Sequence, residues 1–91
     1  MKKYQLTEQY EMNIIGDMSI VFSQDLTKIY QAGKIETIII SAFKAPITIQ
    51  SVKERVCNIE KFNEDEFILF ISNLIERNII SETKDDICVL L

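Results

Sequence analysis

The spacing of the apolar residues changes once along the chain, and this change constrains the fold more than any other feature. Before residue 33 the chain is typical of strands: Tyr10–Ile14 alternates apolar and polar residues with a period of two, and Met18–Ser23 is rich in β-branched and aromatic residues. From Lys34 onward, apolar residues recur at spacings of three and four, which is typical of helices. A chain of 91 residues has room for one domain. The pattern therefore predicts a single α+β domain covering residues 1–91, with a sheet followed by helices.

The first part of the chain predicts a three-stranded antiparallel sheet. Gly16 and Asp17 provide a hairpin turn, because glycine accepts positive φ without strain. Gln24 and Asp25 provide a second turn candidate. The expected strands are Tyr10–Ile14, Met18–Ser23 and Leu26–Gln31.

Three helices are expected in the second part. The first begins at Lys34 and ends before Pro46, and we prefer a helix to a strand there because its apolar spacing extends over three turns. That spacing is formed by Ile35, Ile38, Ile39, Ala42 and Phe43. Thr48 is expected to cap a second helix from Ile49 to about Cys57, with Ile47 packing on Val52 as a hydrophobic staple.

The third helix has the clearest signals at both ends. Asn63 is an N-cap candidate, and Glu66 three residues later fits a capping box. Arg77 has the charge that the negative end of a helix dipole favours, and Asn78 can take the left-handed conformation that ends a helix. These signals predict a helix over residues 64–77.

The C-terminal residues predict a small β wing. Two short apolar runs flank the polar turn at residues 83–86, namely Ile79–Ser81 and Ile87–Leu90. The complete prediction is a winged helix-turn-helix with an N-terminal three-stranded antiparallel sheet, three helices and a short C-terminal β wing.

Composition argues against several classes of function. The 14 acidic residues outnumber the 10 basic ones, which argues against a general nucleic-acid binder. Histidine is absent and there is no Gly-rich phosphate loop, so we expect no catalytic residue, no cofactor and no metal site. Cys57 and Cys88 have apolar neighbours and are expected to be buried, reduced thiols. The polar start and the lack of an apolar run of ~20 residues favour a cytoplasmic protein without a membrane segment.

The last predicted helix has more apolar residues than one core-facing stripe needs. A first stripe contains Phe67, Phe70, Ile71 and Leu74, a second row contains Ile68 and Ile75, and Leu69 adds a third position. A helix that covers one core needs an apolar arc of roughly 100°. Two interpretations remain open: both sides of the helix are buried, or one side borders a groove for an apolar partner.

The third predicted strand offers an edge for binding. An edge strand has unpaired N–H and C=O groups to which an extended peptide can add as a further strand. Lys28 in this strand could pair with an acidic residue of such a peptide, or it could simply protect the edge from aggregation.

The order of these elements resembles that of the PqqD-like domains, the recognition elements for ribosomally made precursor peptides. The resemblance covers nearly the whole chain and lies in Ile29–Gln31, Ile35–Ile39, Pro46–Val52 and Phe67–Ile80. It implies a non-catalytic domain that binds the leader segment of a precursor peptide as an added strand. The implied peptide contacts are Lys28, Ile29, Tyr30, Ile68, Ile71, Leu74 and Ile75.

The same resemblance implies separate partners. The domain would present the peptide to a maturation enzyme such as a radical SAM enzyme, a dehydratase, a cyclodehydratase or a leader protease. A stand-alone recognition element of this kind is expected to be a monomer or weak dimer that binds neither nucleic acid nor membrane. Two alternatives stay open: a winged-helix DNA-binding regulator that uses Gln50, Ser51, Lys53 and Arg55, and an adaptor whose apolar helix binds another folded protein.

Overall fold

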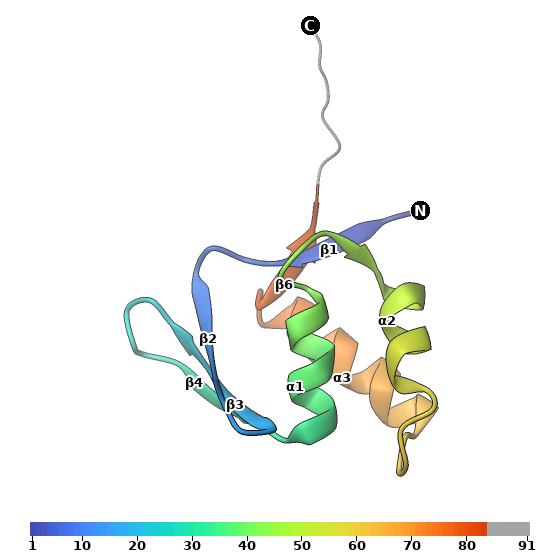
Figure 1. Ribbon diagram of the computed structural model, residues 1–91. Coiled ribbons are helices and arrows are strands. Elements are labelled where there is room, and N and C mark those ends of the chain that lie inside the picture. Colours follow the sequence, from blue (N-terminus) through green and yellow to red (C-terminus); the bar gives the residue numbers. More distant parts are fainter. Residues whose placement is uncertain (84–91) are drawn as a thin grey trace, which may run out of the picture.

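The computed structural model describes residues 1–83, which form two antiparallel three-stranded sheets and three helices (Figure 1). The elements, in chain order, are β1 (Lys3–Leu6), β2 (Tyr10–Ile15), β3 (Met18–Ser23), β4 (Ile29–Ala32), α1 (Lys34–Ala42), β5 (Ile47–Thr48), α2 (Ile49–Val56), α3 (Glu64–Glu76) and β6 (Ile80–Glu82). The predicted α+β fold class, with a three-stranded sheet before three helices, is confirmed.

The sheet β2-β3-β4 is the predicted meander. Gly16 has φ of 66° in the turn between β2 and β3, as the sequence predicts. The third strand begins at Ile29, three residues later than expected from Leu26. Leu26 has φ of 60°, a left-handed conformation that no strand accepts, so the chain is still turning at this position. The prediction of a strand start at Leu26 is therefore wrong, although the strand itself is confirmed.

The second sheet, β5-β1-β6, joins segments that are far apart in the sequence. β1 is the central strand, pairing with β5 at Lys3↔Thr48 and with β6 at Leu6↔Ile80. The sequence analysis assigned no strand to either β1 or β5. The wing strand at Ile79–Ser81 is confirmed within one residue, but its partner is the N-terminal strand. The other expected wing strand, Ile87–Leu90, lies outside the described residues.

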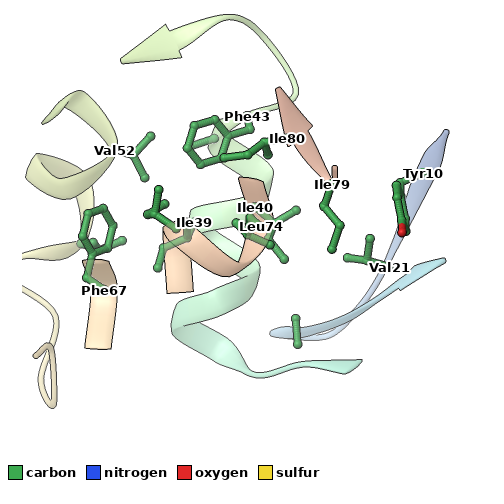
Figure 2. Close-up of a cluster of buried hydrophobic side chains, with 14 residues drawn as sticks. Tyr10, Val21, Ile39, Ile40, Phe43, Val52, Phe67, Leu74, Ile79 and Ile80 are labelled. Carbon is green, nitrogen blue, oxygen red and sulfur yellow. The ribbon is translucent and has the colours of Figure 1, made fainter. Parts of the chain in front are cut away.

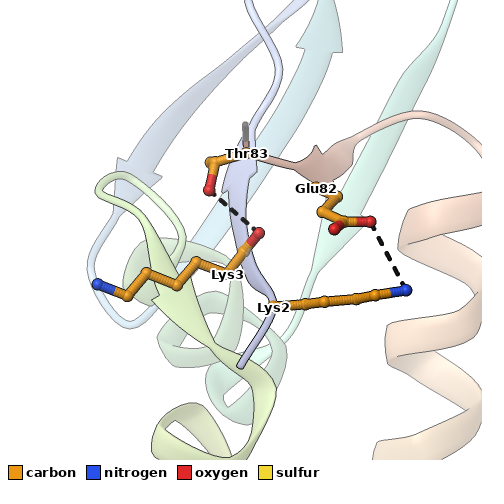
Figure 3. A network of polar contacts seen from close by, with 4 residues as sticks. All are labelled: Lys2, Lys3, Glu82 and Thr83. Carbon is orange, nitrogen blue, oxygen red and sulfur yellow. Dashed lines mark hydrogen bonds and ion pairs between the residues drawn. The ribbon is translucent and has the colours of Figure 1, made fainter. Parts of the chain in front are cut away.

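Polar contacts near the start of the chain link β1 to the end of β6 in this second sheet (Figure 3). The Thr83 hydroxyl donates to the Lys3 carbonyl at 3.2 Å, and the Lys2 ammonium lies 3.9 Å from a Glu82 carboxylate oxygen. Both ion-pair partners are largely exposed, so this ion pair contributes little to stability. Backbone pairing rather than charge therefore holds β1 between its neighbours.

The helices begin and end where local signals place them. The Thr48 hydroxyl accepts a hydrogen bond from the Ser51 N–H at 3.1 Å, and the Asn63 side chain accepts one from the Glu66 N–H at 3.0 Å. Asn78 has φ of 60° just after α3. All three helices are confirmed: α2 and α3 agree within one residue at each end, and α1 begins at Lys34 as predicted and ends at Ala42, before Pro46.

The core lies between the three helices and the inner faces of both sheets (Figure 2). Phe43 and Ile40 of the α1 region, Leu74 of α3 and Ile80 of β6 are among the largest fully buried side chains. In Figure 2, Val52 and Phe67 lie toward one end of this cluster and Tyr10 and Val21 toward the other. A buried hydrogen bond of 2.8 Å between the Ser19 and Thr37 hydroxyls ties β3 to α1. One core therefore fixes α1 and α3 against the meander.

Cys57 is exposed, contrary to the sequence prediction. It is the C-cap of α2, where Val56 takes the buried position and the next residue turns out of the core. Cys88 lies outside the described residues.

Candidate functional site

β4 is an edge strand in the part of the chain that the structure describes. It pairs with β3 alone, in antiparallel register. The Ser23 N–H donates to the Lys28 carbonyl at 2.9 Å just before β4 begins. Because antiparallel pairs alternate, Tyr30 then also turns its N–H and C=O toward β3, while Ile29 and Gln31 turn theirs to the open side. Two residues of β4 therefore present backbone donors and acceptors to an incoming strand.

The helix α3 runs close to this edge. The rings of Tyr30 in β4 and Phe70 in α3 have centroids 6.2 Å apart. The guanidinium carbon of Arg77, the C-cap of α3, lies 6.0 Å from the centre of the Tyr30 ring, within the range of a cation–π contact. Tyr30 is thus covered by an aromatic ring and a cation from the helix.

A hydrogen bond fixes the Tyr30 ring. Its hydroxyl donates to the Glu36 carboxylate at 3.0 Å, and the other oxygen of that carboxylate accepts from the Gly33 N–H at 2.8 Å. Burial and this hydrogen bond to Glu36 raise the pKa of Tyr30 to about 12, an effect that the nearby Arg77 charge partly offsets. The hydroxyl therefore stays protonated at neutral pH and keeps donating.

The C-terminal end of α3 is anchored to the segment between β1 and β2. The Thr7 hydroxyl donates to the Asn78 carbonyl at 2.8 Å, and the Thr7 N–H donates to the Ile79 carbonyl at 2.9 Å. The Ile79 N–H in turn donates to the Leu74 carbonyl at 2.9 Å, which closes the left-handed end of the helix at Asn78. These bonds fix the end of α3 in place, and with it the position of Arg77 beside β4.

Three hollows border α3 one after another, and we call this region the seam; the first lies against the start of α1, and the other two lie against β4. The first, of about 360 Å³, is lined by Gly33, Lys34, Ile35, Glu36, Ile39, Lys61, Phe62, Asn63, Glu66, Phe67 and Phe70. The second, of about 40 Å³, is a small dent lined by Tyr30, Phe70, Asn73, Leu74, Arg77 and Ile79. The third, of about 550 Å³, is lined by Tyr10, Thr27, Lys28, Ile29, Tyr30, Glu76, Arg77 and Ile79. Neighbouring hollows share lining residues: Phe70 borders the first and second, and Tyr30, Arg77 and Ile79 border the second and third.

The structure brings only some of the expected contact residues to the seam. Lys28, Ile29 and Tyr30 line its third hollow. Ile71 and Leu74 are 4% and 2% exposed and belong to the core, although Leu74 also lines the second hollow, and their contact with a peptide stays a prediction. They are buried because they lie on the side of α3 that faces α1 and the sheets.

Ile68 and Ile75 are exposed, but on another side of α3. Their side chains are 54% and 37% exposed, so the interpretation that both sides of this helix are buried is wrong. At about 100° per residue, both lie roughly 140–180° around the helix from Phe70 and Arg77. Neither residue lines any of the three hollows of the seam.

Phe70 and Arg77 line the seam, although the sequence does not single them out as contact residues. By sequence, Phe70 belongs to the first apolar stripe and Arg77 favours the negative end of the helix dipole. The two are seven residues apart and therefore lie on one side of a helix, which was the available signal. Nothing in the sequence indicated that β4 would lie on that side.

The loop before β4 is closed by Asp25. One of its carboxylate oxygens accepts from the Ser23 hydroxyl at 2.7 Å, the Thr27 hydroxyl at 2.7 Å and the Thr27 N–H at 3.1 Å. These hydrogen bonds lower the pKa of Asp25 to about 2. These bonds fix the turn around the left-handed Leu26 and thereby fix where β4 begins.

This lowered pKa predicts how the loop responds to acid. The stabilisation from the ionised Asp25 is fully present above the unfolded-state value near 3.8 and is lost as the pH falls through about 2. We expect an NMR titration of the Asp25 carboxyl carbon to give a midpoint near 2. A midpoint near 3.8 would mean that the three hydrogen bonds are not formed in solution.

No group of three or more metal-ligating side chains lies together within residues 1–83. In the same residues, no helix combines the length and apolar character needed to cross a membrane.

The fold is shared with a solved structure. A search of protein-family models gave no match, and a search of curated proteins found no related sequence. Among solved structures, the chain is similar to one described as TbiB1 in complex with the TbiA(beta) leader peptide. The TM-score is 0.73 at 10% sequence identity, and the match covers 89% of this chain and 99% of that one. The winged-helix α+β fold is thus shared over nearly the whole chain, and the resemblance noted in the sequence is supported at the level of the fold.

Proposed function

We propose that this chain is a non-catalytic domain that binds the leader segment of a ribosomally made precursor peptide as an added strand on β4. The observation that carries the proposal is the open edge of β4 beside a row of adjoining hollows along α3. The structural neighbour supports it, since a protein of the same fold was solved with a leader peptide.

In strand addition, the peptide backbone and the peptide side chains make different contributions to binding. The peptide backbone bonds the free groups of Ile29 and Gln31, which supplies affinity that is independent of sequence. Alternate peptide side chains then point toward α3, where Tyr30, Phe70 and Arg77 form the floor of the seam. We therefore place the specificity of this site on Phe70 and Arg77 rather than on Ile68 and Ile75.

The domain itself performs no reaction in this proposal. Its contribution is effective concentration, because a docked leader keeps the rest of the precursor near a separate maturation enzyme. We propose a cytoplasmic protein, acting as a monomer or weak dimer, with the precursor peptide and that enzyme as partners.

The charges of the helices weigh against DNA binding. The first turn of α3 holds Glu64, Asp65 and Glu66, which phosphates would repel. Lys53 of α2 lies 2.9 Å from Glu64 and is therefore engaged within the protein. No feature of the described residues favours the regulator over the peptide-binding domain.

The experiment uses peptides of about 15 residues selected from a displayed random library against the full chain. Fluorescence anisotropy with a selected peptide then compares Phe70→Asp with Ile68→Asp, the same change on the same helix. We expect Phe70→Asp to weaken binding tenfold or more, roughly 1.4 kcal/mol, because it places a charge on the floor of the seam. Ile68→Asp is expected to retain the wild-type affinity.

Thermal unfolding of both variants serves as the control for folding. Loss of binding in Ile68→Asp with no change in Phe70→Asp would place the peptide on the other side of α3. If the chain selects no peptide at all, the proposed function is wrong. Should Phe70→Asp fail to fold, a substitution on the open side of β4 tests the same site, as described in the Discussion.

A further inference from the structure

We infer that the seam selects peptide segments in which a large apolar residue is followed, four positions later, by Asp or Glu. This inference rests on the proposed function and adds the chemistry and direction of the bound segment. It follows from the difference between the two ends of the seam.

The end of the seam near the start of α1 and α3 is apolar. The hollow of about 360 Å³ has a floor of aromatic and aliphatic side chains and a rim of charged ones. Its floor consists of Ile35, Ile39, Phe62, Phe67 and Phe70. An apolar side chain seated there loses contact with water without leaving a polar group unpaired, which favours apolar residues over polar ones.

The other end of the seam holds two cations. Lys28, Arg77 and Glu76 are the ionisable side chains, apart from tyrosine, that line the hollow of about 550 Å³. The ion pairs formed within residues 1–83 are Lys2–Glu82 and Lys53–Glu64, so neither Lys28 nor Arg77 forms an ion pair in the part of the chain described. Lys28 does lie close enough to Asp25 to help lower the pKa of that carboxyl, which leaves Arg77 as the main cation for a ligand. On a chain of net charge −4, this end is a local site for a carboxylate.

Arg77 is the better placed of the two cations for recognition. Its guanidinium carbon lies 6.0 Å from the centre of the Tyr30 ring, within the range of a cation–π contact, and Tyr30 is itself fixed by its hydrogen bond to Glu36. A guanidinium presents its N–H donors in one plane, which suits two-point binding of a carboxylate. Lys28 adds charge beside it.

The distance between the ends sets the spacing in the peptide. Phe70 and Arg77 are seven residues apart on α3, about 10.5 Å, and the apolar hollow extends one further turn back to Glu66 and Phe67. Extended residues on one side of a strand recur every second position, at about 6.6 Å. Four positions, about 13 Å, connect the two ends, whereas two positions are too short.

The direction of the bound segment follows from the sheet. β2, β3 and β4 are all antiparallel to their neighbours, and antiparallel pairing is the more stable way to extend such a sheet. β4 runs from the cationic end, at Ile29, to the apolar end, at Gly33. An antiparallel segment therefore runs from the apolar end to the cationic end, which places the apolar residue first and the acid second.

The test is a pair of selections from the same random peptide library, against the full-length wild type and against Arg77→Glu. We expect wild-type peptides to be enriched in Asp or Glu at the fourth position after an enriched Phe, Tyr, Leu or Ile. For Arg77→Glu we expect Lys or Arg at that position. In a selected wild-type peptide, the change of its acid to the amide should weaken binding about fivefold to tenfold, and the loss should shrink at high salt.

The outcomes separate this inference from the proposed function. Peptides that bind through the β4 edge but show no acid, or show the acid before the apolar residue, overturn the inference and leave strand addition intact. An acid preference that persists in both Arg77→Glu and the conservative Arg77→Gln overturns the role of Arg77. A chain that selects no peptide overturns both. Thermal unfolding of each variant shows whether a lost preference reflects a lost fold.

Discussion

The variant Gln31→Pro is expected to reduce peptide binding about 100-fold, the largest effect on binding of any substitution considered. The N–H of Gln31 points to the open side of β4, so proline removes a donor that only an added strand would use. The ring also occupies the space in which the incoming backbone would lie. Proline is tolerated on an edge strand at such a position, and therefore we expect the domain to stay folded.

The matched control is Gln31→Ala, which keeps the N–H and changes only an exposed side chain. We expect its affinity for a selected peptide to stay within about twofold of wild type. Anisotropy titrations measure both affinities, and circular dichroism shows whether both variants are folded. Unchanged binding by a folded Gln31→Pro domain would mean that the peptide does not pair with β4.

The variant Phe43→Ala is expected to lose about 3–5 kcal/mol of stability, the largest effect on folding. Phe43 is 0% exposed and follows α1 in the centre of the core. Its carbonyl accepts a hydrogen bond from the Leu6 N–H at 2.7 Å, so the cavity would lie where β1 meets the helices. Because a domain of this size has about 5–10 kcal/mol in total, the variant would lose a large part of its stability and unfold at a clearly lower urea concentration.

Urea unfolding monitored by circular dichroism measures this loss. The control variant Ile68→Ala truncates an apolar side chain on the surface instead of in the core, and it should change stability by no more than about 0.5 kcal/mol. A loss below about 1 kcal/mol for Phe43→Ala would show that the side chain is not enclosed as the structure describes.

The helices were predictable because their signals are local. The caps of α2 and α3, Thr48 and Asn63, act on N–H groups three residues away. Pro46 cannot continue a helix, and Asn78 readily takes the left-handed conformation that ends one, so both mark helix ends through their own backbone preferences. Such signals need no knowledge of the rest of the molecule, and the two capped helices agree with the prediction within one residue at each end.

The two sheets differ in the sequence separation between their paired strands. The hairpin of β2 and β3 has its turn at Gly16 and Asp17, so its register follows from adjacent residues. β1 pairs with segments more than 40 residues away, as in Lys3↔Thr48. Lys3–Leu6 alternates polar and apolar residues, but a run of four residues is too short to be a reliable strand signal, and its pairing exists only once α1 and α3 bring its partners together.

The sequence by itself determined the order of elements, the ends of the helices, and the presence of a strand next to the helical part with an apolar surplus on the last helix. These properties depend on contacts a few residues apart. The rotation of α3, which places Phe70 and Arg77 over Tyr30 and turns Ile68 away, was decided by the tertiary structure alone. A helix with apolar residues on several sides can pack in more than one rotation with similar burial, and distant bonds from Thr7 to the end of α3 help select one of them.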